Sequence, residues 1–410
     1  MKHLLSLLGF LVGSFALGAG DWPQFRGPGG QGHSQATGLP TEWDAKTNVV
    51  WKQAIPGSGW SSPVVVGGKI FLTAAVPGGG KDLSLRAICL DASTGKIAWD
   101  NEVFLQATGS PKIHVKNSHA SPTPIVEDGK LYVHFGHQGT ACLDLAGKIL
   151  WSNRDVKYAP VHGNGGTPVL VDGKLVFSTD GETVREVIAL DAKTGKLAWR
   201  TPRTGPVGKQ FSFSTPLVIE VAGKKQIVSP ASDVVGAYDP ATGAEIWKCH
   251  YKGYSVIPRP VFGHGMLFLS TSYDSASALA IKADGKGDVT ETHLAWTIKK
   301  GAPHTPSMLL VGDELYMVSD GGLGSCVDAK TGKVHWQNRL GGNGYSASPI
   351  YADGKLWFLS EDGVGTVVKA GKTFEQISRN ALGERTLASY AATDGALFIR
   401  TEGHLYRIGK

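Results

Sequence analysis

The sequence predicts an all-β chain folded as an eight-bladed β-propeller, and three regularities support this. A tryptophan recurs at intervals of 40 to 52 residues, close to the roughly 40 to 50 residues that one four-stranded blade needs. A second element, starting near a proline, recurs eight times. A strand-like stretch near the N-terminus matches a strand that the last repeat lacks. Together these features give eight four-stranded units closed into a ring.

The tryptophans end a hairpin with the pattern small-x-Asp-x-x-Thr-Gly-Lys-x-x-Trp, as in Cys89 to Trp99. The Thr-Gly pair supplies the positive φ that such turns need, and the apolar residues around it alternate as they do in strands. One copy is a residue shorter and another carries an insertion. The recurring residues are Trp51, Trp99, Trp151, Trp199, Trp247, Trp296 and Trp336.

A second hairpin precedes each of these and begins near a proline, or at Ala391 in the last unit. The prolines are Pro63, Pro124, Pro168, Pro216, Pro260, Pro306 and Pro349. Just before this element we place a serine or threonine in most units: Ser62, Ser121, Thr167, Thr215, Thr305 and Ser348. Arg259 stands there in the fifth unit, which makes it the most unusual residue of the repeat.

The ends of the chain are expected to meet in one blade. Residues 390–408 have room for only three strands, and residues 48–55 read as a fourth strand with no blade around it. Pairing them closes the ring and removes two exposed sheet edges. We therefore predict a propeller over residues 48–410, with an N-terminal extension over residues 21–47.

Residues 1–20 resemble a secretory signal peptide. A charged start precedes an apolar stretch from Leu4 to Leu17, and small residues offer cleavage positions between 16 and 21. The apolar stretch is too short to span a bilayer and no second one follows. We expect a periplasmic or secreted protein with no transmembrane segment after signal removal, and an uncleaved anchor remains the alternative.

Charge and cysteine usage narrow the function classes. The net charge of +6 is spread along the chain without a run of five basic residues, so we expect no nucleic-acid partner. Cys89, Cys142 and Cys326 occupy one repeat position in different blades, separated by at least a sheet-packing distance of about 10 Å, whereas a disulfide needs Cα atoms within roughly 7 Å. We expect no disulfide.

The Trp hairpin resembles the tryptophan-docking motif of the pyrroloquinoline-quinone (PQQ) type propellers, in which the indole packs between neighbouring blades. Beyond the motif, residues 21 to 409 resemble the PQQ-binding-like, BamB-like propeller repeat family. The segments that carry this resemblance are Asp21 to Pro28, Tyr254 to Pro260, Gly285 to Thr290 and Gly301 to Pro306.

The resemblance implies two activities, and the chain departs from each. Many eight-bladed PQQ-dependent dehydrogenases carry two adjacent cysteines over the cofactor, with acidic calcium ligands and a catalytic Asp, but no two cysteines are adjacent here. BamB-like proteins are anchored through a lipidated cysteine, and no cysteine lies near the expected cleavage region. We therefore name no catalytic residue, expect neither cofactor nor metal, and keep PQQ with calcium as an alternative.

Candidate binding residues lie on one face of the ring. Antiparallel strands place turns 1-2 and 3-4 on one face and connections 2-3 and 4-1 on the other. The second face carries the variable loops, where binding residues usually occur. The candidates are Trp60, His119, His162, Asn164, Tyr254, Arg259, His304 and Tyr345.

Each candidate has a structural alternative. Arg259 would hold a carboxylate or phosphate if it points into the channel, or else act as a structural cation bound to carbonyl groups. Four residues stand three or four positions before a proline of their blade, which would place them near the mouth of the central channel: Trp60, His119, Phe213 and Tyr345. They either bind a ligand there or fill the channel.

The leading function hypothesis is an exported, monomeric, non-catalytic binding or scaffold protein for a protein, peptide or glycan of the cell envelope. The alternatives are a PQQ- and calcium-dependent dehydrogenase and a glycan-binding or polysaccharide-active propeller. Whether the chain is an enzyme stays open, with a non-catalytic role favoured.

Overall fold

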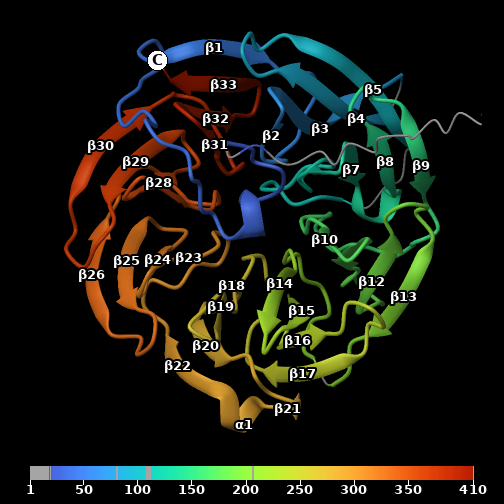
Figure 1. The fold of residues 1–410 in the computed structure, drawn as a ribbon, viewed down its shortest axis with the longest axis vertical. Coiled ribbons are helices and arrows are strands. Elements are labelled where there is room, and N and C mark those ends of the chain that lie inside the picture. Colours follow the sequence, from blue (N-terminus) through green and yellow to red (C-terminus); the bar gives the residue numbers. More distant parts are fainter. Residues whose placement is uncertain (1–17, 19, 80–81, 108–111, 206, 410) are drawn as a thin grey trace, which may run out of the picture.

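A computed structural model describes residues 18, 20–79, 82–107, 112–205 and 207–409. Its sheets stand around a central axis like the blades of a propeller (Figure 1). Eight sheets are present, each with four antiparallel strands, and one of them has an additional short strand. The predicted all-β, eight-bladed propeller is confirmed.

The first four blades follow one another along the chain, and their strands run from the axis outward in sequence order. Blade 1 contains β2 (Val64–Val66), β3 (Lys69–Pro77), β4 (Leu83–Asp91) and β5 (Ile97–Gln106). Blade 2 contains β6 (Ile125–Glu127), β7 (Lys130–His134), β8 (Thr140–Asp144) and β9 (Ile149–Asn153). Blade 3 contains β10 (Val169–Val171), β11 (Lys174–Ser178), β12 (Glu186–Asp191) and β13 (Leu197–Pro202). Blade 4 contains β14 (Leu217–Val221), β15 (Lys224–Ala231), β16 (Val234–Tyr238) and β17 (Glu245–His250).

The other four blades complete the ring. Blade 5 contains β18 (Val261–Gly263), β19 (Met266–Ser270), β20 (Ala278–Lys282) and β22 (Leu294–Ile298). Blade 6 contains β23 (Leu309–Val311), β24 (Glu314–Val318), β25 (Leu323–Asp328) and β26 (Val334–Arg339). Blade 7 contains β27 (Ile350–Ala352), β28 (Lys355–Leu359), β29 (Val364–Lys369) and β30 (Gln376–Ala381). Blade 8 contains β31 (Ala391–Thr393), β32 (Ala396–Arg400), β33 (His404–Gly409) and, as its outer strand, β1 (Val49–Ala54).

The ring closes as predicted, through the pairing of β1 with β33. The two strands run antiparallel, with Trp51 opposite Arg407 and Ala54 opposite His404. Figure 1 shows β1 at the rim beside β33. The first and last strands of the chain therefore share one sheet, and neither is left as an open edge.

Six of the eight blades are connected to the next blade by a tryptophan of their outer strand. The indole N–H of Trp51 donates to the carbonyl of Ala92 in blade 1, 3.2 Å away, and the ring covers Gly95 of the same turn. Five other tryptophans donate in the same way to the next blade, over 2.9 to 3.2 Å: Trp99, Trp151, Trp199, Trp296 and Trp336. A Cβ at Gly95 would lie 2.6 Å from the indole, so the Thr-Gly turn needs glycine for space as well as for its φ of 72°.

Trp247 departs from this pattern because blade 5 carries the insertion. Its N–H donates to Gln226 within its own blade, and the ring is fully buried. The short strand β21 (Gly287–Asp288) pairs in parallel with β17 beside it and leads into α1 (Thr290–His293). The insertion therefore covers the outer edge of blade 4, where six other blades receive the turn of the next blade.

The hydrophobic core lies between neighbouring blades. One cluster joins Val176 and Ala189 of blade 3 with Ile227 and Tyr238 of blade 4. The four cysteines are buried as free thiols, and burial raises the pKa of Cys89 to about 11. Three of them, Cys89, Cys142 and Cys326, lie opposite the tryptophan of the adjacent strand and leave room for it, as Ala189 does opposite Trp199.

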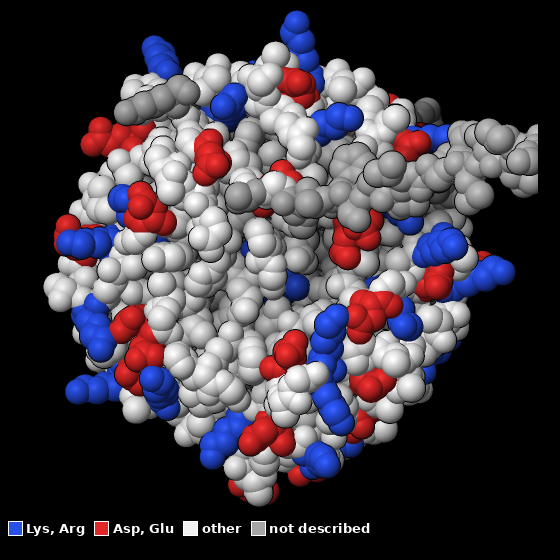
Figure 2. Space-filling model, in the orientation of Figure 1, with Lys and Arg blue, Asp and Glu red and all other residues white. Residues whose placement is uncertain are grey.

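The N-terminal extension crosses the axis on the face that carries turns 1-2 and 3-4. Trp22 pairs with Val65 in blade 1, whereas His33 pairs with Tyr351 in blade 7. Between them lies η1 (Pro28–Gly30), at the centre of Figure 1. Figure 2 shows this face, with basic and acidic side chains interspersed around its rim. Residues 1–17 and 19 of the expected signal segment lie outside the described residues.

Candidate functional site

A cavity of about 370 Å³ lies on the axis, on the face of the 2-3 and 4-1 connections. Its lining comes mainly from the segments that lead into the innermost strand of each blade. Phe25, from the N-terminal extension on the opposite face, also lines it and forms its floor. The channel is therefore closed on that side by the N-terminal extension. The other short 3-10 helix, η2 (Gly136–Gln138), lies in the 2-3 connection of blade 2.

A belt of hydroxyl groups encircles the lower part of this cavity. In seven blades the residue at one repeat position is Ser or Thr, and its oxygen accepts a hydrogen bond from the backbone N–H at the equivalent position of the preceding blade, over 2.9 to 3.1 Å. All seven line the cavity: Ser62, Thr123, Thr167, Thr215, Ser307, Ser348 and Ser389. The belt ties successive blades together at the axis.

A second ring lies two residues before the belt. All eight residues at that position line the cavity: Trp60, Ser121, Gly165, Phe213, Ile257, Thr305, Ser346 and Leu387. Side chains two residues apart in extended backbone point to the same side. Two stacked rings, here called the hydroxyl belt and the upper ring, therefore face the axis.

In two blades the predicted Ser or Thr of the repeat position was wrong by two residues. Ser121 and Thr305 were aligned with Ser62, but the residues that make the interblade hydrogen bonds are Thr123 and Ser307. Both blades have a Pro-x-Pro or Thr-Pro-Ser sequence that offers two candidate positions. Ser121 and Thr305 belong to the upper ring instead.

A line of aromatic rings, in edge-to-face or tilted contact with one another, lies along one wall of the cavity. Neighbouring rings approach with centroids 5.8 Å apart for His114 and His162, 5.3 Å for His162 and Phe211, and 6.0 Å for Phe211 and Tyr254. Tyr273 follows at 6.3 Å from Tyr254. All five line the cavity. We call this row the aromatic arc.

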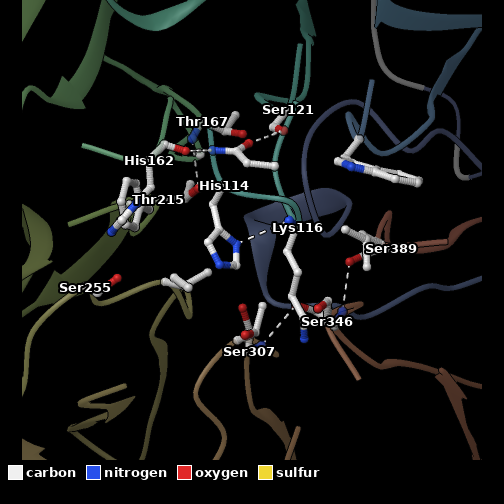
Figure 3. A pocket seen from close by; sticks show the side chains of 18 of the residues that line it. His114, Lys116, Ser121, His162, Thr167, Thr215, Ser255, Ser307, Ser346 and Ser389 are labelled. Atoms are coloured by element: carbon white, nitrogen blue, oxygen red, sulfur yellow. Dashed lines mark hydrogen bonds between the residues drawn. The ribbon is translucent and has the colours of Figure 1, made fainter. Parts of the chain in front are cut away.

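One segment of the long connection between blades 1 and 2 extends across the cavity mouth. On one side the backbone N–H of His114 donates to His162, 3.1 Å away. On the other side Lys116 Nζ lies 2.7 Å from Glu361 Oε1 of blade 7, and Arg385 donates to the carbonyl of Val115. Figure 3 shows Lys116 and His114 reaching over the hydroxyl belt residues. Residues 112–118 therefore form a partial cover, held at both ends.

The described lining is close to electrically neutral. Lys116 is its one Lys or Arg, and it is paired with Glu361; no lining residue is Asp or Glu. Burial, together with the nearby His114 and Lys209, lowers the pKa of His162, so its imidazole is neutral at pH 7. Within the described residues, no group of three His, Cys, Asp or Glu is placed to hold a metal ion.

Arg259 lies beneath the cavity rather than in it. The side chain is 3% exposed, its Nε donates to Pro216 O over 3.0 Å, and its Nη1 donates to Phe25 O over 2.9 Å. Gly30 packs so closely on the guanidinium that a Cβ there would lie 2.0 Å from Nη1. Burial lowers the pKa of Arg259 to about 9. The structure places this residue as a buried cation bound to carbonyl groups, the alternative raised above.

The structure brings only some of the other candidates into the cavity. Trp60, His162 and Tyr254 line it, whereas His119, Asn164, His304 and Tyr345 do not. Strand alternation turns three of these side chains away from the axis, because they stand an odd number of residues before the belt position: Asn164, His304 and Tyr345. His162 also stands at an odd position, but its positive φ of 65° changes the direction of the backbone, and its side chain lines the cavity.

The residues that point away from the cavity have their own partners. Tyr345 is fully buried and donates to the carbonyl of Gly341. Asn164 accepts from Tyr158, and its amide lies 3.0 Å from His137. The ring nitrogen Nδ1 of His119 lies 3.0 Å from Nε2 of Gln106, and the ring of His304 packs against Tyr273 at a tilt, with centroids 4.9 Å apart.

Sequence reasoning missed Phe25, Phe211, Ile257 and Tyr273 as lining residues. A period of two counted back from the belt would have found Phe211, which stands four residues before Thr215, and Ile257. Phe25 has no such signal because the extension lies outside the repeat.

Three proteins of known name are similar in sequence to parts of this chain. Polyvinylalcohol dehydrogenase of Sphingopyxis sp. is 24% identical over 81% of this chain and 62% of its own length. Outer membrane protein assembly factor BamB of Yersinia pestis is 26% identical over 47% of this chain and 50% of its own length. A methanol dehydrogenase subunit of Methylobacterium organophilum is 31% identical, but the match spans 33% of this chain and 24% of that protein.

Solved structures with the same fold include a BamB protein and a methanol dehydrogenase. BamB from Moraxella catarrhalis superposes with a TM-score of 0.61 at 14% identity, covering 88% of this chain and 99% of that one. A europium-containing methanol dehydrogenase superposes with a TM-score of 0.69 at 12% identity, covering 96% and 98%. At these identities the likeness establishes the fold alone.

The family comparison covers most of the propeller. The sequence model described as outer membrane protein assembly factor BamB matches residues 41–182, 140–250, 187–290 and 231–397. In the described part of the chain, no helix has the length and apolarity needed to cross a membrane. Because the matches extend over far more than half of the sequence, the chain belongs to the PQQ-like repeat propeller family described by the name BamB.

Proposed function

We propose that this chain is a non-catalytic binding propeller of the cell envelope, with its ligand in the cavity on the face of the 2-3 and 4-1 connections. The observation that carries the proposal is the lining: hydroxyl groups and aromatic rings converge on one cavity, and no described lining residue is a carboxylate. A volume of about 370 Å³ lies at the small end of pockets for small molecules, which span roughly 300–1,000 Å³. The cavity suits a small molecule or the end of a chain.

The names of several relatives raise the alternative of a quinone-dependent dehydrogenase, and the donor set tests it. Calcium takes about six to eight oxygen ligands, usually including carboxylates. The described lining offers hydroxyl and amide oxygens but no Asp or Glu, and Glu361 nearby is paired with Lys116. PQQ is itself an anion, and among the described lining residues Lys116 is the one Lys or Arg. These residues do not fit calcium with PQQ, so we derive no redox step.

The proposed function also includes export from the cytoplasm and a partner in the cell envelope. Residues 1–20 are proposed to direct the chain out of the cytoplasm, which would make the mature protein periplasmic or secreted. The relatives named for outer-membrane assembly support an envelope role. A protein or peptide partner would bind as a chain end entering the cavity, and the protein is proposed to act as a monomer.

Native mass spectrometry of protein purified from envelope extract tests whether the cavity is a binding site. The Ile257→Trp variant fills the cavity without removing a polar lining group, and Val334→Trp on the exposed outer strand is its control. A bound small molecule present in the wild type and Val334→Trp, but absent from Ile257→Trp, is expected. No bound species in any of the three would count against the proposal.

The dehydrogenase alternative has a separate test. Titration with PQQ and calcium, followed by absorbance and by dye-linked alcohol oxidation, is expected to give no saturable binding and no turnover. Saturable binding accompanied by oxidation would replace the binding-protein proposal.

A further inference from the structure

The hydroxyl belt presents a ring of unused donors to the cavity. Each of its seven oxygens accepts one backbone N–H, and among the described residues none of their own O–H groups has an acceptor. Each of these residues is at most 4% exposed. Buried polar groups in proteins are normally paired, because a lost hydrogen bond costs about 1–3 kcal/mol. The belt therefore suits a ligand whose perimeter carries oxygen acceptors.

The upper ring is not uniform around the axis. Blades 4 and 5 contribute Phe213 and Ile257, and blades 8 and 1 contribute Leu387 and Trp60. In an eight-membered ring these two pairs of blades face each other across the axis, as Figure 1 shows. The two apolar pairs therefore form opposed walls of a slot.

The sides between these walls carry small residues. Blades 2 and 3 contribute Ser121 and Gly165, and blades 6 and 7 contribute Thr305 and Ser346. The cavity thus has two apolar walls, two small and mostly polar sides, and donors around its lower perimeter. A disc-shaped molecule with apolar faces and a polar edge matches this arrangement.

Charge narrows the class of ligand. An anion in this cavity would meet Lys116 already paired with Glu361, and the guanidinium of Arg259 is bound to carbonyl groups beneath the floor. A cation would meet no free carboxylate in the described lining. Burying an unpaired charge is costly. A neutral ligand avoids that cost.

We propose that the cavity binds a neutral sugar ring, as a free sugar or as the end residue of an oligosaccharide. This rests on the proposed binding function and names its ligand class. A pyranose has C–H faces that pack on aromatic and aliphatic walls, and a rim of hydroxyl oxygens that accept from the belt and donate in return. Phe25 closes the floor, so a chain end enters and an internal residue of a long chain does not.

The experiment is a calorimetric titration of the mature protein with a panel of neutral sugars: glucose, galactose, mannose, N-acetylglucosamine and their β- and α-linked oligomers. Saturable binding of at least one sugar is expected. Phe211→Ala, in the aromatic arc, is expected to weaken binding at least tenfold with an unchanged melting temperature. Phe374→Ala is the matched control, because Phe374 packs on Trp336 away from the cavity.

A belt residue gives a second arm. Thr215→Val keeps the side-chain volume but removes the O–H donor and the acceptor used by Thr167. Thr215→Ser retains both. Sugar binding is expected to fall in Thr215→Val and to persist in Thr215→Ser, and the melting temperature of each variant separates this effect from a loss of folding.

Several results would overturn the inference. These are the absence of binding across the panel, sugar binding that Phe211→Ala leaves unchanged, and tighter binding of inorganic phosphate, a peptide or PQQ than of any sugar. If the panel fails while native mass spectrometry still detects a small molecule that Ile257→Trp excludes, the sugar assignment falls and the binding function stands. If neither experiment detects a ligand, both fall.

Discussion

Lys52 and Glu384, 332 residues apart in the chain, approach to 2.5 Å between Nζ and Oε1. Lys52 lies on β1, and Glu384 also accepts from Tyr406 on β33 and Thr401, while one of its oxygens lies 3.0 Å from a ring nitrogen of His404 on β33. The carboxylate therefore connects the two strands whose pairing closes the ring. This one side chain adds polar contacts to a joint that also has backbone hydrogen bonds and the packing of Trp51 against Phe398.

This contact predicts an acid-sensitive ring closure. Burial opposes ionisation of Glu384, but hydrogen bonds from Lys52, Tyr406, Thr401 and His404 outweigh it and lower the pKa to about 2. A folded-state pKa below the unfolded value contributes stability above the unfolded pKa, and that stability is lost as the pH falls through the folded pKa. The melting temperature should decrease from about pH 5 towards pH 2.

The Glu384→Gln variant tests this linkage. Its melting temperature should be lower than that of the wild type at pH 7 and should converge with it near pH 2. Glu375→Gln, which breaks only an exposed pair with Lys369, serves as the control. Parallel curves for Glu384→Gln and the wild type over the whole range would contradict the assignment.

The bridge between Lys116 and Glu361 predicts a different kind of effect. The two side chains are 37% and 15% exposed, so the pair should contribute at most about 1 kcal/mol to global stability. It holds one end of the 112–118 segment, however. In Lys116→Gln, hydrogen–deuterium exchange should increase at the amides of His114, which donates to His162, and of Asn117, which donates to His114. The melting temperature should not change.

Lys369→Gln, which breaks an exposed pair on blade 7, is the matched control and should leave exchange in this segment unchanged. Faster exchange spread over the whole propeller in Lys116→Gln would indicate global destabilisation instead of a local latch.

Arg259 should act on stability through the N-terminal extension. Arg259→Ala leaves the carbonyls of Pro216 and Phe25 without this donor, and an unsatisfied buried acceptor costs about 1–3 kcal/mol. The extension should also loosen, so that trypsin cuts after Arg26, which is 1% exposed in the intact fold. Limited proteolysis and thermal unfolding measure both effects.

Arg200→Ala provides the comparison, because Arg200 is 44% exposed and forms a single surface pair. Its melting temperature and cleavage pattern should match the wild type. If Arg259→Ala also matched the wild type but lost sugar binding, the guanidinium would have to reach the ligand, contrary to its position beneath the floor.

The sequence was sufficient for the architecture because the repeat encodes it locally. Each Asp-x-x-Thr-Gly turn and each outer tryptophan is readable in its own unit, and the count of units together with residues 48–55 determines the closure. Side-chain direction was harder to predict. Arg259 shares a repeat position with the belt threonines, yet its length carries it under the floor, while Tyr345 and Asn164 point away by strand alternation.

The floor and the cover of the cavity could not be predicted from the repeat. Phe25 reaches the axis because residues 21–33 cross from blade 1 to blade 7, and no periodic pattern identifies where an extension will lie. The 112–118 segment depends on contacts with Glu361 and Arg385, more than 240 residues further along the chain. Contacts of this kind arise only once the ring has closed.

Two tryptophan substitutions should separate structure from binding. Trp199 is 9% exposed, donates to Pro240 in the next blade and covers Gly243, so Trp199→Ala should lower the free energy of unfolding by about 3–5 kcal/mol through a buried cavity and a lost hydrogen bond. Trp60 is only half-buried on the cavity wall, and its indole N–H makes no bond to another blade among the described residues. Trp60→Ala should therefore retain most of the stability, measured by denaturant unfolding, while it weakens binding of a neutral sugar. Equal losses of stability in the two variants would mean that the upper ring is part of the structural core and that the cavity is not built for a ligand.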